Sequence, residues 1–148
     1  MTITFTPSFI SIIFSIITVL VLLAWGWVGV QTWLKRRRLG AVDQQNIARR
    51  WKEIETMFGS ESEPARKLAI LEADKLLDEI LKTLMMPGET MGERMKVAGY
   101  KYEGIREAWT GHKIRNRLVH ESVFHLSPRL AREAMTSFKS AFKSLGLL

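Results

Sequence analysis

A run of 22 uncharged residues, 9–30, sets the strictest limit on how this chain can fold. It reads FISIIFSIITVLVLLAWGWVGV, and its only polar side chains are Ser and Thr, whose hydroxyls can donate to carbonyls of the same helix. As an α-helix the run is about 33 Å long, against a hydrocarbon core of about 30 Å. We therefore expect a single transmembrane helix, with the lipid bilayer as the partner of residues 9–30.

The C-terminal end of this run and the residues after it predict its orientation. Trp25, Trp27 and Trp33 gather at its C-terminal end, where indole rings favour the membrane interface, and the basic tetrad KRRR follows at 35–38. Residues 1–34 contain no Asp, Glu, Lys or Arg. Because positive charge marks the cytoplasmic flank, we expect a single-pass cell-membrane protein with its N-terminus outside and its C-terminal domain cytoplasmic.

Two alternatives to a spanning helix are a cleaved signal peptide and a buried core helix. A signal peptide normally has a charged start, a shorter apolar core and a small-residue cleavage site, none of which matches this run. A core helix seldom runs this long without a charge. The predicted organisation is a tail and transmembrane helix over 1–34, a basic juxtamembrane linker over 35–40, and a cytosolic helical bundle over 41–148.

Composition narrows the chemistry of that bundle. The chain has no cysteine, so disulfides, thiolate metal sites and thiol nucleophiles are excluded. Of its 22 Lys and Arg residues the tetrad holds four, which leaves 18 against 15 Asp and Glu over residues 39–148. The folded domain is therefore only mildly basic, and its charge alone does not predict nucleic-acid binding. The tetrad itself is typical of topology control and attraction to anionic lipids.

Amphipathic patterns over 41–148 predict helices and no strand. The first has apolar residues at helical spacing and ends at Gly59 and Ser60. A long helix is expected after Ser62 as N-cap and Pro64, through residues 68–86 to a break at Pro87 and Gly88. The apolar positions of these two helices are Ile47, Trp51, Ile54 and Phe58, then Ala69, Ala73, Leu76, Leu77, Ile80 and Leu84.

Three further helices are expected over about 89–98, 102–119 and from Ser127 onwards. The last begins with Ser127 as N-cap and Pro128 in the first turn, and one stripe carries its apolar side chains. The stripe consists of Ala131, Ala134, Met135, Phe138, Phe142 and Leu145. The predicted fold class is therefore all-α: one N-terminal transmembrane helix followed by a four- to five-helix bundle.

The candidate catalytic residues lie near the end of the helix predicted over 102–119, in the run RNRLVH. Asn116 is four residues before His120, so the two share a helix face, and the amide can orient the imidazole. Arg115 is five residues before His120, about 140° around the helix. The two can converge where the helix ends, or across two copies of the domain. A fixed cation beside a titratable base suits phosphodiester cleavage without a metal.

This run resembles the signature of the HEPN superfamily, all-helical domains of many prokaryotic RNA-cleaving proteins, over about residues 41–148. The signature is an arginine, often a polar residue next, and a histidine four to six positions later, which Arg115, Asn116 and His120 match. The resemblance implies a homodimer with two motifs facing each other, and metal-independent RNA cleavage that leaves a 2′,3′-cyclic phosphate. Ser122 stands where one toxin branch of the family has tyrosine, which argues against that branch.

Alternatives to catalysis stay open at this point. Arginine and histidine near a helix C-terminus also stabilise the helix through its macrodipole, and Asn116 and His120 can cap carbonyls. The domain would then be a non-catalytic tethered adaptor that binds protein or RNA, or the anchor subunit of a partner in the membrane. No cofactor or metal is expected, because His112 and His120 are about 12 Å apart along the axis and no carboxylate completes a site.

Several titratable residues have a structural and a functional interpretation. His112 is expected to be half-buried and hydrogen-bonded, or alternatively to line the same cleft as His120. His125 and Glu121 are expected in solvent, and pairing with an arginine is the alternative for Glu121. The carboxylates of Glu72, Asp74, Asp78 and Glu79 favour a solvated or ion-paired face. The alternative is that Asp74 or Asp78 orients Arg115 or His120 from the neighbouring helix.

Overall fold

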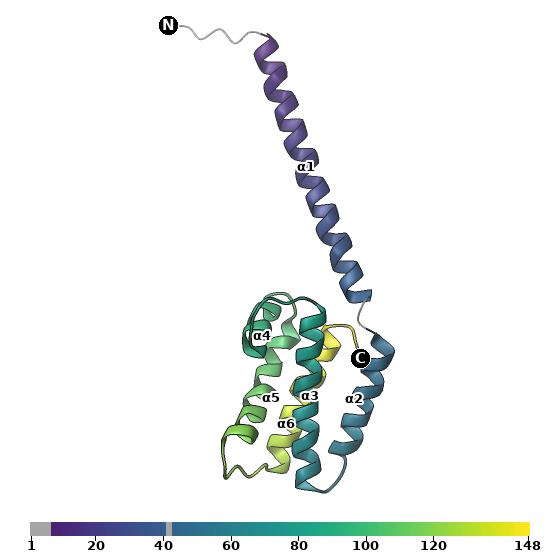
Figure 1. Cartoon of the computed structure of the whole chain (residues 1–148), viewed down its shortest axis with the longest axis vertical. Helices are drawn as coiled ribbons and strands as arrows, with labels where there is room; N and C mark the ends of the chain where they lie inside the picture. The colour runs from purple at the N-terminus through teal and green to yellow at the C-terminus, as the bar shows by residue number, and fades with distance from the viewer. Residues whose placement is uncertain (1–6, 41–42) are drawn as a thin grey trace. The chain divides into compact units, whose positions relative to one another are not determined.

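The computed structural model describes residues 7–40 and 43–148, which form two separate compact units, and the side chains of 11–30 and 43–148. These residues are all-helical, as predicted, and contain no strand. The helices are α1 Pro7–Gly40, α2 Gln44–Phe58, α3 Glu63–Thr83, α4 Met91–Gly99, α5 Glu103–His120 and α6 Pro128–Ser144. The described residues thus form one apolar N-terminal helix and, as a separate unit, a bundle of five helices (Figure 1).

Helix α1 is long and apolar enough to cross a bilayer. Within it, Ser11–Val30 has a mean hydropathy of 2.4, and none of that segment is buried. Ser15 and Thr18 donate their hydroxyls to the carbonyls of Ser11 and Phe14, at 2.9 and 2.8 Å, as expected for an apolar surrounding. The helix continues through the expected linker 35–40, while the tail 1–6 and the side chain of Trp33 lie outside the described residues.

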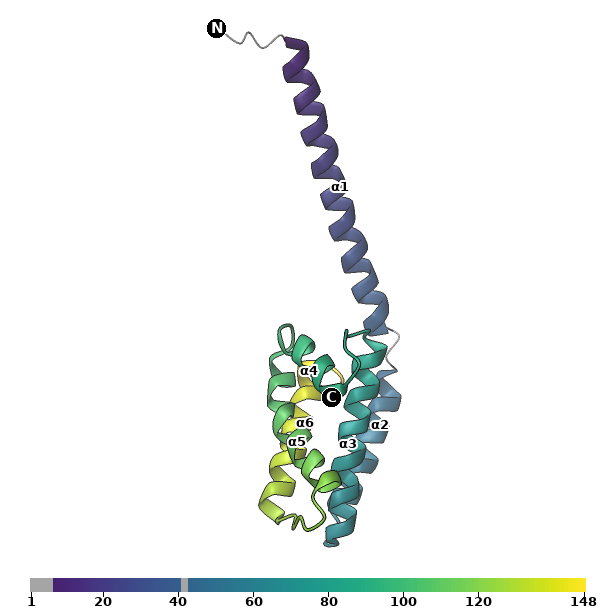
Figure 2. The same cartoon turned by 60° about the vertical axis from the view of Figure 1, so that its left-hand side comes forward.

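In the bundle, α3 is the central helix and packs on α2, α4, α5 and α6. Both views show α3 between α2 and the α5–α6 pair (Figures 1 and 2). The predicted apolar stripes form the core, which confirms that helical periodicity was read correctly from the sequence. Phe58 is the exception, since it packs against the core only half-buried.

The N-caps differ from one another for a physical reason. Ser127 accepts a hydrogen bond from the backbone N–H of Leu130, as predicted. Ser62 has the extended backbone of an N-cap but makes no such bond. Pro64 occupies the second helical position after Ser62 and has no N–H to donate, so one of the two usual donors is missing.

Helix α3 ends earlier than predicted. The break was expected at Pro87 and Gly88, but the last helical residue is Thr83. Met85 adopts a positive φ of 53°, and the N–H of Met86 reaches back to the carbonyl of Leu81 at 2.9 Å. This is a Schellman ending in which a methionine takes the place that glycine usually fills.

Helices α5 and α6 approach each other most closely at two glycines. A Cβ on Gly104 would lie 2.7 Å from the carbonyl oxygen of Ser140, and one on Gly111 would lie 2.6 Å from Phe138. The N–H of Gly111 also carries a hydrogen bond to Ser137 Oγ, at 3.0 Å, beyond its place in the helix. Only glycine fits at either position, so α5 is pressed directly against α6.

Candidate functional site

One candidate residue of α5, Arg115, contacts a buried carboxylate on α3. Asp74 is 3% exposed, and its two oxygens contact two residues of α5. Oδ1 is 2.8 Å from Nδ1 of His112, and Oδ2 is 3.1 Å from Nε of Arg115. A carboxylate removed from water needs such partners, so these contacts hold the two helices in register.

Asn116 closes these contacts into a ring of four side chains. Nη1 of Arg115 donates to Oδ1 of Asn116 at 3.0 Å, and Nδ2 of Asn116 lies 3.2 Å from Nε2 of His112. We call Asp74, His112, Asn116 and Arg115 the polar ring. Each member contacts the next, and the last returns to Asp74.

The polar ring fixes where its protons lie. A guanidinium has only donors, so the oxygen of Asn116 must face Arg115 and its NH2 must face His112. Nε2 of His112 is therefore the acceptor, which leaves the imidazole proton on Nδ1, pointing at Asp74. The neutral Nδ1–H form is the one tautomer that satisfies every contact of the ring.

Burial divides the ring into an inner and an outer half. Asp74 and His112 are buried, whereas the side chain of Arg115 is 34% exposed. The Nε–H of Arg115 is buried and not aligned for a hydrogen bond, so its contact with Asp74 is ionic. Nη2 makes no hydrogen bond within residues 43–148, so the guanidinium keeps donors for an anion.

His120 is the last residue of α5 and is exposed. Among the described residues no hydrogen bond or ion pair joins it to Arg115 or Asn116, although those two contact each other. Asn116 was expected to orient His120, but its amide contacts His112, which lies one turn before Asn116. His112 is already held in place by Asp74, whereas His120 is free to rotate in solvent, so the bond to His112 costs less side-chain entropy.

The sequence offered a functional role for Asp74 and His112 only as an alternative to a structural one. Two carboxylates of α3 are ion-paired, as expected: Glu79 with Arg50 at 2.6 Å, and Asp78 with Lys82 and Arg94. Asp74 instead contacts Arg115, which was the alternative expectation for the carboxylates of this helix. His125 is 82% exposed, as expected, and lies 3.4 Å from Glu63. Glu121, expected in solvent, pairs with Arg117 at 2.9 Å.

Asp78 forms a second polar cluster, between α3 and α4. Arg94, 6% exposed, donates from Nε and Nη2 to Oδ1 of Asp78, and Lys82 reaches Oδ2 at 2.7 Å. Burial raises the pKa of this carboxyl, but the hydrogen bonds from Lys82 and Arg94 outweigh it, so the net pKa lies below the ordinary value. Arg94 also donates to the carbonyls of Gly88 and Glu89, so this cluster pins the turn before α4.

The described residues contain no group of three or more His, Asp or Glu side chains that could hold a metal ion. No protein-family model matches the chain, and neither a curated protein nor a solved structure shows significant similarity to it. The function must therefore be argued from the arrangement of its own side chains.

Proposed function

We propose that the chain is a single-pass membrane protein whose HEPN-like bundle is a metal-independent endoribonuclease at the cytoplasmic face. The observation that carries the proposal is on α5. Arg115 is held by Asp74 and Asn116 with guanidinium donors left over, and His120 is exposed on the same helix, without a hydrogen bond or ion pair among residues 43–148. A preorganised cation and a free base are the two groups that cleavage by the 2′-hydroxyl requires.

Arg115 would bind the phosphate. Its Nη1 and Nη2 hydrogens can donate to two non-bridging oxygens, and its orientation is already set by Asp74 and Asn116. Asn116 acts in this proposal as a positioning residue for Arg115. Because the ion pair with Asp74 already offsets its charge, Arg115 would bind the phosphate mainly through its hydrogen bonds.

His120 would take the proton of the 2′-hydroxyl. As the 2′-oxygen bonds to phosphorus, the bond from phosphorus to the 5′-oxygen breaks, and that oxygen leaves with a proton from a protonated histidine or water. The products are a 2′,3′-cyclic phosphate and a 5′-hydroxyl. Charge grows on the phosphoryl oxygens during this step, where Arg115 stabilises it.

Two copies of the bundle would complete the site. Arg115 and His120 are five residues apart, about 140° around α5, so their side chains leave the helix in different directions. In a homodimer with a two-fold axis near the end of α5, Arg115 of one copy can serve with His120 of the other. Helix α1 would raise the local concentration of bundles by confining them to one membrane.

The test is cleavage of labelled single-stranded RNA by the full-length protein in non-ionic detergent with excess EDTA. We expect fragments ending in 2′,3′-cyclic phosphate, and a loss of rate of about 100-fold or more in His120→Ala. His125→Ala is the matched control, because His125 is also exposed and lies outside the polar ring. Intact RNA with the wild type, or equal cleavage by His120→Ala, would refute the proposal.

A second candidate is a non-catalytic adaptor bound to the membrane. The observation that favours it is the polar ring, which gives Arg115 and Asn116 a purely structural reason to be present. This alternative predicts that Arg115→Ala lowers the melting temperature while no RNA cleavage exists to be lost. Thermal unfolding of Arg115→Ala and His120→Ala beside the cleavage assay therefore separates the two candidates.

A further inference from the structure

A hollow of about 450 Å³ opens between α4 and α5, at the other end of α5 from His120. Its lining consists of Met95, Lys96, Gly99, Tyr100, Arg106 and Trp109. Tyr100 is 84% exposed at the C-terminus of α4, and no hydrogen bond of its hydroxyl is found in the described bundle. The hollow therefore combines two aromatic rings with two long cationic side chains.

Two glycines shape this hollow. A Cβ on Gly99 would lie 3.0 Å from Cγ of Arg106, and a Cβ on Gly92 would lie 3.3 Å from the ring of Trp109. The aliphatic stem of Arg106 and the indole therefore rest on α4 backbone. The ring of Trp109 also meets the ring of His112 edge-on, with centroids 5.7 Å apart. Packing thus holds Trp109 between the hollow and the polar ring.

The charge around the hollow is mainly positive. Lys96 and Lys113 are exposed and make no ion pair within the bundle 43–148. Arg106 lies 3.7 Å from Glu103, but both side chains are largely exposed, so this pair is weak. The carboxylate of Glu93 is occupied by the N–H groups of Glu89 and Thr90. An anionic ligand in the hollow would meet Lys96 and Arg106, and Lys113 follows one turn after Trp109 on α5.

A line of side chains connects the hollow with His120. Arg106, Trp109, Lys113, Asn116 and His120 follow one another at steps of three and four residues, so they share one side of α5. From Arg106 to His120 this line is about 21 Å long. It alternates cationic, aromatic and polar groups, which matches the phosphates and bases of a short nucleic-acid strand.

We propose that the hollow binds a base of single-stranded RNA, stacked on Tyr100 and Trp109, while Lys96 and Arg106 bind the flanking phosphates. The strand then follows α5 towards His120. Aromatic stacking with basic side chains is the usual recognition of unpaired strands, because every base has a face to stack. This inference rests on the proposed function and names its substrate class: single-stranded rather than duplex RNA.

Binding is best measured with the full-length protein in detergent and in the His120→Ala background, where the RNA stays uncut. The probe is a fluorescein-labelled single-stranded RNA of mixed sequence, read by fluorescence anisotropy, beside a duplex of equal length. We expect tighter binding of the single strand, a loss of about tenfold in Tyr100→Ala, and near-complete retention in Tyr100→Phe. Stacking on one aromatic ring is worth enough for that loss.

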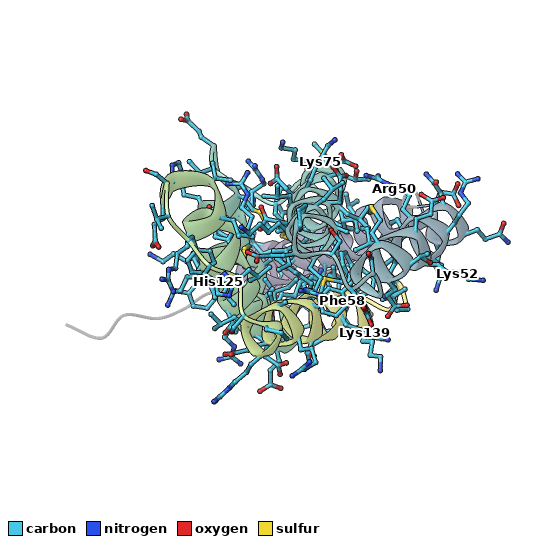
Figure 3. The ribbon with its side chains drawn as sticks, turned by 90° about the horizontal axis from the view of Figure 1, so that it is seen from below. Arg50, Lys52, Phe58, Lys75, His125 and Lys139 are labelled. Carbon is cyan, nitrogen blue, oxygen red and sulfur yellow. The ribbon has the colours of Figure 1, made fainter. Side chains whose placement is uncertain are left out.

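A lysine control separates this site from general attraction to RNA. Lys96→Ala should weaken binding and flatten its dependence on salt. Lys52→Ala should change neither much, because Lys52 projects from α2 on the outer side of the bundle (Figure 3) and does not line the hollow. Equal losses from both variants would mean unspecific attraction and would overturn the inference.

The outcomes also distinguish this inference from the nuclease proposal. Unchanged binding in Tyr100→Ala, or equal binding of duplex, overturns the stacking site whether or not the wild type cleaves. Strand binding that depends on Tyr100, in a protein that never cleaves, supports the site and refutes the nuclease. Displacement of the RNA by an acidic peptide at equal concentration would indicate a protein partner and overturn the RNA assignment.

Discussion

His112 and Asp74 meet across the interface of α3 and α5, with Nδ1 of the histidine 2.8 Å from Oδ1 of the aspartate. The imidazole is buried, and its second nitrogen faces the amide of Asn116. Because Arg115 determines which way that amide points, a residue at the surface sets the proton position of a buried histidine.

The first prediction concerns this proton. Long-range ¹H–¹⁵N correlation spectra of the imidazoles should show the neutral form of His112 as the Nδ1–H tautomer. His120 serves as the comparison, since among residues 43–148 no hydrogen bond or ion pair selects one tautomer of its exposed ring. A neutral His112 with its proton on Nε2 would contradict the arrangement of the polar ring.

The second prediction concerns the close approach of α5 and α6. Gly111→Ala should lower the free energy of unfolding by about 1–2 kcal/mol, because overpacking costs about 1–3 kcal/mol and the gain in helix propensity returns up to about 1. Thermal or urea unfolding of the full-length chain in detergent measures this change.

Gly59→Ala is the matched control for Gly111→Ala. A Cβ on Gly59 would lie 3.5 Å from two carbonyl oxygens, which is ordinary contact, and its φ is −66°. A Gly111→Ala protein as stable as Gly59→Ala would show that Phe138 moves aside at no cost.

The third prediction is a loss of stability in acid through Asp78. Its pKa is lowered in the folded chain: burial acts against this, and the hydrogen bonds of Lys82 and Arg94 prevail. A lowered carboxyl pKa stabilises the fold above the unfolded value of about 3.9, and this contribution disappears as the pH falls through the folded pKa.

Urea unfolding at pH 6 and pH 3 tests the role of Asp78. Asp78→Asn should be less stable than the wild type at pH 6, and the difference should shrink at pH 3. Glu53→Gln, an exposed change on α2 without an ion pair in the bundle, is the control. A difference that stays constant with pH would show that Asp78 contributes nothing through its charge.

The fourth prediction is the membrane topology. The chain has no cysteine, so single cysteines can report on each side. Thr2→Cys should react with a membrane-impermeant maleimide on intact cells, and Ser122→Cys, exposed on the bundle, only after lysis. The opposite pattern would reverse the orientation, and a shortened N-terminus on sequencing would identify a cleaved signal.

Helical periodicity and capping patterns, which involve only neighbouring residues, were sufficient to predict most of the fold. The apolar stripe of α6 was read correctly because side chains at period 3.6 reveal which face is buried, and Ser127 was recognised as a cap because its donor lies three residues away. The end of α3 differs from the prediction, because the helix stops at the positive φ of Met85 and not at Pro87, the helix breaker in the sequence.

The candidate site depended on contacts that sequence spacing cannot resolve. Asn116 is four residues from both His112 and His120, so periodicity alone gives no preference between them. The preference comes from Asp74, 38 residues before His112, which holds one of the two histidines in place. The hollow was likewise invisible in sequence, since it depends on two α4 glycines accepting side chains of α5.

The glycine contacts of α5 have a mechanical consequence. Gly104 and Gly111 lie against α6 two turns apart, while Asp74 on α3 contacts His112 and Arg115 of the same helix. Because contacts with two neighbouring helices hold α5, a rotation of α5 about its own axis would disturb its close packing on α6 and the partners of the buried carboxylate. Coupling between Tyr100 and His120 would therefore require a ligand that contacts both residues. A ligand too short to reach both would leave the two ends of α5 uncoupled.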